Sequence, residues 1–247
     1  MPDRVRNCFG AALALAALFS LTRCATMRET TLPRSGALLA PTERLLVDAH
    51  PADAPMEVVQ NDTPAGDAFL RAKAAPIDAG DPSLPRLVAR MRASVLQEKG
   101  VGIAAPQVGV SRRLVIVQRL DREPEQPFVV YLNPVITELS DETAVEWEGC
   151  LSVPAGHARV RRPLASTGGY DLETGERASE HVEGFTARIF QHEIDHLDGV
   201  LFIDKMEPGP LTPKAEYREM RRQQKEAKDA ARKNIDETMK DLKAPGK

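Results

Sequence analysis

The sequence has few cysteines, no excess of basic residues and no long apolar run, and each shortage excludes a class of protein. Three cysteines in 247 residues are too few for a fold held together by several disulfide bonds. The 33 Lys and Arg against 36 Asp and Glu give a net charge of −3, which argues against a DNA-binding protein with a chain-wide cationic surface. No apolar run reaches the roughly 20 residues of a membrane-spanning helix. Since 42% of the residues are hydrophobic, the length allows one sizeable soluble core with or without tails.

The first 27 residues predict a targeting segment. Arg4 and Arg6 precede an apolar stretch at 9–21, which has the length of a signal-peptide core. The residues before Cys24 resemble a lipoprotein cleavage site, although Arg23 stands where a small residue is usual. One interpretation is therefore an envelope or periplasmic protein, lipidated at Cys24. The other is a cytoplasmic protein whose translation starts at Met27.

The two regions that flank the middle of the chain predict little packing. Residues 28–55 contain several prolines and no sustained period, which indicates a linker with at most one short helix near 42–47. Residues 209–247 form a charged tail that predicts an exposed helix. Its Lys and Arg side chains suggest a weak contact with the ribosome or another anionic surface, and a solvated helix is the simpler interpretation.

Residues 56–208 have the patterns of a folded domain. Apolar spacing predicts helices at 84–99 and 182–197. Short β-branched runs predict strands at 114–117 and 128–132, the second ending at Asn133-Pro134. Short strands and two long helices without regular alternation indicate the α+β class.

The strongest chemical signal lies on the second of these helices, in the sequence Gln191-His192-Glu193-Ile194-Asp195-His196. Histidines four residues apart share one helical face, so His192 and His196 can ligate one metal ion. Glu193 lies beside the first ligand and can exchange a proton with a water bound there. A surface helix that carries two histidines by chance is the alternative, but the surrounding apolar residues indicate that this helix is buried.

A helical pair of histidines needs a third protein ligand. The candidates are Cys150, several carboxylates and the remaining histidines, His50, His157 and His181. Cys150 is preferred because two histidines in metal spacing need another donor. A buried structural cysteine or a cysteine nucleophile with a histidine base are the alternatives.

A glycine-rich segment at 100–109 is a further candidate. Its spacing fits neither a phosphate loop nor a dinucleotide site. Its small residues allow another backbone to approach closely. Gln107 follows them and could donate its amide to a developing oxyanion, whereas a simple turn would leave Gln107 unexplained.

Taken together, GVGIAAPQVG, EGCLSVP and QHEIDHLDG resemble, in order and character, the three signature motifs of the peptide deformylase family. The resemblance covers roughly residues 56–208. It implies an α+β fold with short, mostly antiparallel sheets around a central metal-binding helix, followed in this chain by the exposed C-terminal helix. It also implies removal of the N-formyl group from formyl-methionyl peptides or nascent proteins, with release of formate.

The resemblance also implies roles for single residues. Cys150, His192 and His196 would hold one divalent metal ion, usually Fe²⁺, with Zn²⁺, Ni²⁺ or Co²⁺ able to replace it. Glu193 would be the general acid and base. Gln107 and the backbone N–H of Leu151 would stabilise the oxyanion. Gly102 would bind the peptide backbone as an added strand, and Val101 would line the methionine pocket.

Two features depart from the family pattern. Residues 164–170 (LASTGGY) stand where a β-branched strand is expected, and predict a frayed or bulged strand near a sheet edge. The leader is unexpected because deformylation accompanies translation in the cytoplasm; an exported protein would act on released formyl peptides.

Two other functions stay open on the sequence alone. One is an envelope metallopeptidase or amidase of the His-Glu-x-x-His kind, with a third ligand from Asp198, Asp204 or Glu207. The other is a non-catalytic lipoprotein that reuses the fold for binding. An intact Glu193 beside a complete set of ligands argues against the second.

Overall fold

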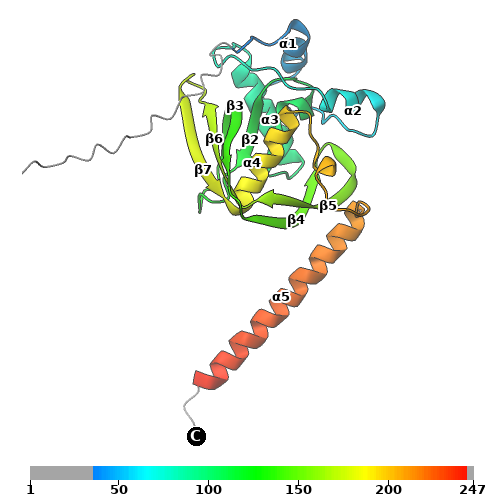
Figure 1. The fold of residues 1–247 in the computed structure, drawn as a ribbon, viewed down its shortest axis with the longest axis vertical. Helices are drawn as coiled ribbons and strands as arrows, with labels where there is room; N and C mark the ends of the chain where they lie inside the picture. Colours follow the sequence, from blue (N-terminus) through cyan, green and yellow to red (C-terminus); the bar gives the residue numbers. More distant parts are fainter. Residues whose placement is uncertain (1–35, 244–247) are drawn as a thin grey trace, which may run out of the picture. The chain divides into compact units, whose positions relative to one another are not determined.

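Strands make up most of the region between α3 and α4 in the computed structural model, which describes residues 36–243 (Figure 1). The helices are α1 (Pro41–Asp48), α2 (Pro64–Leu70), α3 (Leu84–Gln97), α4 (Gly184–Leu197) and α5 (Lys214–Lys243), with 3₁₀ helices η1 (Ala105–Val108) and η2 (Phe202–Asp204). The strands are β1 (Gly102–Ala104), β2 (Leu114–Gln118), β3 (Phe128–Leu139), β4 (Thr143–Cys150), β5 (Val153–Pro163), β6 (Ala165–Asp171) and β7 (Arg177–Glu183).

The strands form two antiparallel sheets. Five of them pair in the order β1-β2-β3-β6-β7, and β4 and β5 form a separate two-stranded sheet. With helices packed against these sheets and a helix at the C-terminal end, the predicted α+β class is confirmed.

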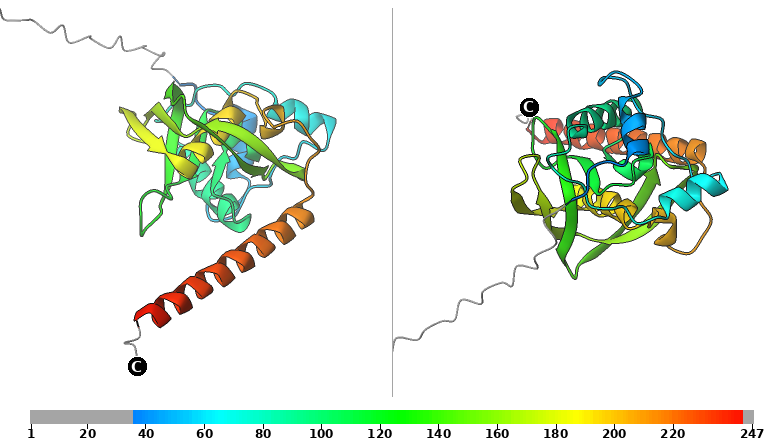
Figure 2. Two further views of the ribbon diagram at one scale, coloured as in Figure 1. Left: turned by 60° about the horizontal axis from the view of Figure 1, so that its bottom comes forward. Right: turned by 90° about the horizontal axis from the view of Figure 1, so that it is seen from above.

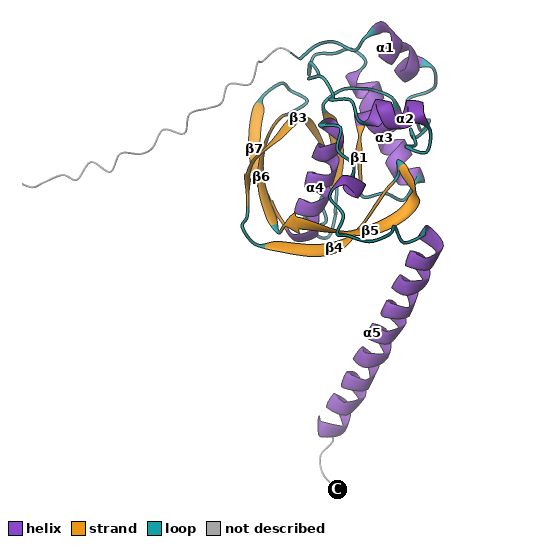
Figure 3. Ribbon diagram, turned by 45° about the vertical axis from the view of Figure 1, so that its right-hand side comes forward, coloured by secondary structure: helices purple, strands orange, loops and turns teal. Residues whose placement is uncertain are grey.

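Helix α4 lies between the two sheets and contacts strands of both (Figure 3). Ile189, Phe190, Ile194 and Leu197 are buried, and most of the polar residues of α4 are buried with them. Burial of each large apolar side chain contributes about 1.5–3 kcal/mol, so the helix is fixed in the core. The histidine pair therefore sits on a buried helix that is packed against both sheets.

The second predicted strand does not end at Asn133-Pro134. Strand β3 continues to Leu139, with register shifts against β6 after Leu132 and after Ile136. Asn133 has a φ of 49°, and its side chain accepts a hydrogen bond from the N–H of Ile77 at 2.8 Å. The Asn133 side chain thus bonds to Ile77 outside the sheet. Strand β3 bulges at Asn133-Pro134 and then pairs with β6 again from Val135.

The segment at 164–170 lies next to the sheet edge, as predicted, but it is not bulged, because it pairs with β7 in unbroken register and the extra residue at both register shifts with β3 belongs to β3. It forms β6, which pairs with β3 on one side and β7 on the other. A Cβ atom on Gly168 would lie 2.6 Å from the Phe190 ring. The glycine is therefore there because α4 packs directly on this strand, which sequence alone does not reveal.

Replacement of Gly168 by alanine is expected to destabilise the protein by about 1–3 kcal/mol, since the buried Phe190 ring must move. Denaturant unfolding measures this change. Gly169→Ala is the matched control, because its new Cβ would meet only the far end of the Arg177 side chain, at 2.9 Å. Equal stabilities of the two variants would contradict the proposed contact.

Residues 36–55 pack against the domain, unlike the linker expected from the sequence. The predicted short helix is α1, which lies beside α3 in Figures 1 and 2. Leu39 and Val47 are buried in the same core cluster as α3. Arg90 of α3 is 2% exposed and donates hydrogen bonds to four backbone carbonyls, those of Leu46, Val47, Ala54 and Pro55. The folded unit therefore begins upstream of residue 56.

The tail forms α5, whose side chains are mostly exposed over the part that the structure describes. Among residues 36–243, no helix combines the length and apolar character needed to cross a membrane. The leader at 1–27, with Cys24 and Met27, lies outside the described residues.

Candidate metal centre and substrate cleft

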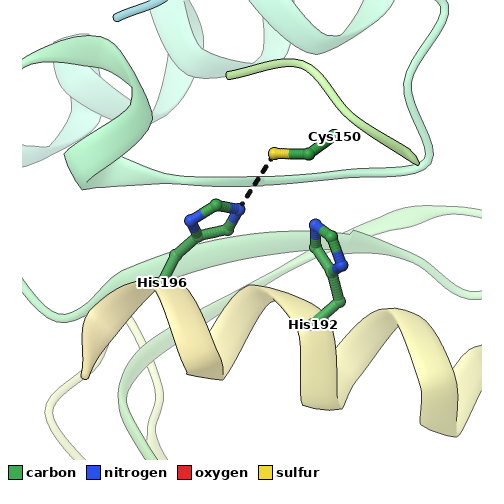
Figure 4. A group of neighbouring side chains, drawn as sticks. All are labelled: Cys150, His192 and His196. Atoms are coloured by element: carbon green, nitrogen blue, oxygen red, sulfur yellow. Dashed lines mark hydrogen bonds between the residues drawn. The ribbon is translucent and has the colours of Figure 1, made fainter. Parts of the chain in front are cut away.

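Three predicted ligand side chains come together at the centre of the fold. His192 and His196 are one turn apart on α4, and Cys150 is the last residue of β4. Figure 4 shows the Cys150 sulfur directed toward His196, with its Sγ 3.2 Å from Nε2 of that ring, and the His192 ring beside them. The potential ligand atoms of all three lie within 4.8 Å of one another.

This arrangement fits a divalent cation. Bonds of about 2.0–2.3 Å to a shared ion place ligand atoms less than about 4.6 Å apart, so little movement is needed. The donor set, one thiol and two imidazoles, suits Fe²⁺, Zn²⁺, Ni²⁺ and Co²⁺. Burial, helped by the positive charges of His192 and Arg162, lowers the pKa of His196 well below its usual range, which keeps that ring neutral as a ligand requires.

Glu148 orients the first histidine. Its Oε2 accepts a hydrogen bond from Nδ1 of His192 at 3.0 Å, which leaves Nε2 of that ring free to face the metal position. The same carboxylate binds Arg162 through both oxygens, at 2.6 and 2.9 Å, and Arg188 at 2.6 Å. Burial raises the pKa of Glu148, but hydrogen bonds from His192 and Arg162 outweigh it and hold the pKa well below its usual range. The sequence contained this residue in the EGC motif but indicated no role for it.

Glu193 lies with its carboxylate against the backbone of Gly102. A Cβ atom at Gly102 would be 2.5 Å from Oε1 of Glu193, so only glycine allows this approach. Within residues 36–243, Oε2 of Glu193 is buried without a hydrogen-bond partner. Burial raises the pKa of Glu193 to about 7, and the positive charges of His192 and Arg162 oppose the rise. A carboxyl group with that pKa can both accept and return a proton near neutral pH.

Gln107 is held with its amide nitrogen toward the sulfur. Its Oε1 accepts a hydrogen bond from the N–H of Ala104 at 2.8 Å, which fixes which end of the amide faces the site. Its Nε2 then lies 3.4 Å from Cys150 Sγ and 3.3 Å from Ser152 Oγ. The 3₁₀ helix η1 thus presents a buried donor beside the metal position.

These groups lie along a cleft of about 500 Å³. Val101, Gly102 and Leu151, which the resemblance assigned to substrate binding or the oxyanion, all line it. Phe185, expected on the apolar face of the second helix, is 53% exposed and lines the same cleft. The structure therefore brings every predicted site residue except His196 to the lining of one cavity, and His196 lies beside it, within ligand distance of Cys150 and His192.

A segment that the sequence did not single out ties two of the motifs together. The N–H of Val59 donates to the Gln107 carbonyl at 2.8 Å, and the N–H of Asn61 donates to the Ser152 carbonyl at 2.9 Å. The Gln60 amide donates to the Leu151 carbonyl at 3.1 Å. This segment, Val59–Asn61, fixes η1 relative to the turn after Cys150. No local pattern could have predicted it, since its contacts span about 50 to 90 residues of sequence.

The alternative metal ligands are engaged elsewhere. Asp198 pairs with Arg113, Asp204 with Arg71, and Glu207 with Arg161. His181 is paired with Glu183 at the surface. In the described part of the chain, Cys150, His192 and His196 are the group with metal-binding spacing. The geometry therefore disfavours a metallopeptidase with a carboxylate as third ligand.

Comparisons with known proteins agree with this geometry. The family model described as polypeptide deformylase matches residues 57–210. A peptide deformylase of Desulforudis audaxviator is 44% identical over 140 residues, which cover 56% of this chain and 88% of that protein. A class I type b peptide deformylase from Acinetobacter baumannii, solved with Met-Ala-Ser bound, is 38% identical with a TM-score of 0.56, over 62% of this chain and 99% of the other. Its actinonin-bound structure is 37% identical with a TM-score of 0.55 and the same coverage.

Proposed function

The chain belongs to the polypeptide deformylase family, and we propose how its residues carry out the reaction of a metal-dependent peptide deformylase. The reaction is hydrolysis of the N-formyl group from a formyl-methionyl peptide, which releases formate and a free amine. The observation that supports it most directly is the convergence of Cys150, His192 and His196 within ligand distance of one another, at a cleft that Glu193 also lines.

The proposal assigns the metal to Cys150, His192 and His196. When bound there, a divalent cation supplies Lewis-acid chemistry and lowers the pKa of a water beside it. Fe²⁺ is the proposed native ion, and Zn²⁺, Ni²⁺ and Co²⁺ are compatible with the same donors. Glu148 supports the centre by holding the His192 ring in one orientation.

Glu193 acts as the general base and then the general acid in this proposal. Its Oε2, which has no hydrogen-bond partner among residues 36–243, takes a proton from the attacking water and returns it to the amine nitrogen as the C–N bond breaks. The Gln107 amide and the Leu151 N–H donate to the oxyanion that develops on the formyl oxygen.

The peptide is proposed to bind beside β1, which is an edge strand of the five-stranded sheet. An edge strand offers unpaired backbone groups, so Gly102 can bind the substrate backbone as an added strand. Val101 lines the cleft next to it and is assigned to the pocket for the methionine side chain.

Formate release tests the function. The full-length chain, purified without oxygen and loaded with Fe²⁺ or Ni²⁺, is expected to release formate from formyl-Met-Ala-Ser and to lose activity when a chelator removes the metal. Acetyl-Met-Ala-Ser serves as the control peptide. Hydrolysis of an internal peptide bond without formate release would instead favour the metallopeptidase.

Replacement of Gln107 by leucine is expected to lower kcat by about 10²-fold, because it removes one oxyanion donor at nearly constant volume. Steady-state kinetics with formyl-Met-Ala-Ser measures the effect. Gln97→Leu, at an exposed position at the end of α3, is the matched control and should retain full activity. An unchanged kcat for Gln107→Leu would contradict the proposed role.

We propose two alternatives for the cellular location of the reaction. Translation from Met27 gives a cytoplasmic enzyme that meets nascent chains, whereas processing at Cys24 gives an envelope lipoprotein that acts on released formyl peptides. Mass spectrometry of the mature N-terminus distinguishes the two.

Helix α5 carries ten basic and seven acidic side chains, and this excess of positive charge supports a weak contact with the ribosome. Co-sedimentation with ribosomes, with and without residues 218–247, tests it.

A further inference from the structure

The beginning of α5 forms part of the wall of the substrate cleft. Lys214 and Tyr217, both in the first turn of α5, line the same cleft as Cys150 and Glu193. These two residues lie outside the region that matches the family model, which ends at residue 210. The tail therefore adds side chains of its own to the substrate site.

The first turn of α5 is fixed in position by backbone and ring contacts. His157 and Thr212 exchange two backbone hydrogen bonds, each of 2.8 Å. The Tyr217 ring stacks on His157, with 3.9 Å between ring centroids and 13° between planes. The Trp147 ring also contacts Tyr217, with 5.5 Å between centroids. A Cβ atom on Gly156 would lie 2.2 Å from the Thr212 carbonyl oxygen, so β5 has a glycine where the tail approaches.

The acidic side chains of the cleft are buried, whereas its lysines lie toward the solvent. The two acidic residues that line it, Glu148 and Glu193, are buried, and Glu148 is fully paired with Arg162, Arg188 and His192. Arg188 also lines the cleft but is satisfied by Glu148 and two backbone carbonyls. The acidic charge of the cleft is therefore confined to its inner part.

The outer part of the cleft carries unpaired positive charge. Lys99 is exposed and Lys214 half-buried, and both line the cleft. Across residues 36–243, neither ammonium group has a carboxylate within 4 Å. Burial lowers the pKa of His157, and the charges of Lys214 and Arg218 lower it further, so this ring stays neutral between them.

We propose that Lys214 and Lys99 bind a carboxylate carried by the peptide downstream of its formyl-methionine. This inference rests on the proposed deformylase function and specifies its substrate class. The carboxylate has two possible sources: the free C-terminus of a short peptide, or an acidic side chain at the third residue. The ring stack of Tyr217 on His157 holds Lys214 in place for this contact.

The test compares kcat/KM for four peptides with the full-length, metal-loaded enzyme. Formyl-Met-Ala-Ser with a free C-terminus is compared with its amide, and formyl-Met-Ala-Asp amide with formyl-Met-Ala-Asn amide. An exposed ion pair changes an equilibrium by up to about fivefold. The pair of peptides that differs in the bound carboxylate is therefore expected to show a kcat/KM about three- to fivefold higher for the acidic member. Lys214→Glu should abolish or reverse the preference. High salt should reduce the preference in the unmodified enzyme.

Lys225→Glu is the matched control, because it makes the same charge change on an exposed position of α5 outside the cleft. It should keep the preference of the unmodified enzyme. A preference in the first pair alone identifies the C-terminal carboxylate, and one in the second pair identifies the side chain. Equal rates in both pairs, or equal effects of Lys214→Glu and Lys225→Glu, would overturn the inference. Failure to release formate from any of the four peptides would overturn the proposed function, and this inference with it.

Discussion

Replacement of Glu193 by glutamine is expected to lower kcat for formate release by roughly 10²–10⁴-fold, the usual contribution of a positioned general base. Glutamine keeps the shape that packs against Gly102 but cannot take a proton from water. The metal should stay bound, because Cys150, His192 and His196 are unchanged. Steady-state kinetics and metal analysis of the same preparation check both parts.

Glu207→Gln is the control for Glu193→Gln. It removes a carboxylate that pairs with Arg161 near the surface, 3.1 Å away, and should leave kcat unchanged. A Glu193→Gln enzyme with full activity would refute the assigned role. Loss of activity together with loss of metal would show that Glu193 acts on the metal site rather than on the proton.

The same substitution is expected to change how the stability of the metal-free protein depends on pH. The pKa of Glu193 is about 7 in the folded protein, above its usual value near 4.5. Between these values the native state binds a proton that the unfolded chain does not, so the free energy of unfolding falls as pH rises. This contribution, up to about 3 kcal/mol, should be absent from Glu193→Gln. Urea unfolding of both metal-free proteins from pH 4 to 8 measures the difference; parallel pH profiles would contradict it.

Replacement of Glu148 by glutamine is expected to give the largest loss of stability, about 3–5 kcal/mol. The carboxylate neutralises Arg162 and Arg188, whose side chains are 3% and 7% exposed, and an amide would leave Arg188 without a carboxylate partner and Arg162 with Asp195 alone. Metal affinity should also fall by about 10- to 100-fold, since the amide is a weaker partner for Nδ1 of His192.

Denaturant unfolding and competition with a metal chelator measure the two effects of Glu148→Gln. Glu146→Gln, an exposed position on the same strand, is the matched control and should change neither quantity appreciably. Normal stability with reduced metal affinity would restrict Glu148 to orienting His192. Normal values for both would contradict its assigned position in the network.

The sequence predicted the metal-binding residues of the site better than the residues that hold them in position. Two histidines one turn apart and a cysteine with no partner in a disulfide are local signals, and they led to the group that the structure brings together. The α+β class also followed from local periodicity. The role of Glu148 did not, because its partners His192 and Arg188 lie 44 and 40 residues away. The Ser, Thr and glycine residues at 164–170 predicted a frayed or bulged strand near the sheet edge, whereas Gly168 makes room for the Phe190 ring.

The hydrogen bonds of Arg90 determine where the smallest fragment that can fold must begin. A chain shortened to begin at Met56 would remove all four acceptors from a guanidinium group that is almost completely buried. A buried cation without partners is strongly unfavourable, so such a fragment would open or rearrange around α3. The folded unit is therefore longer than the region that matches the family model, because residues 46–55 supply the acceptors that keep Arg90 of α3 in the core.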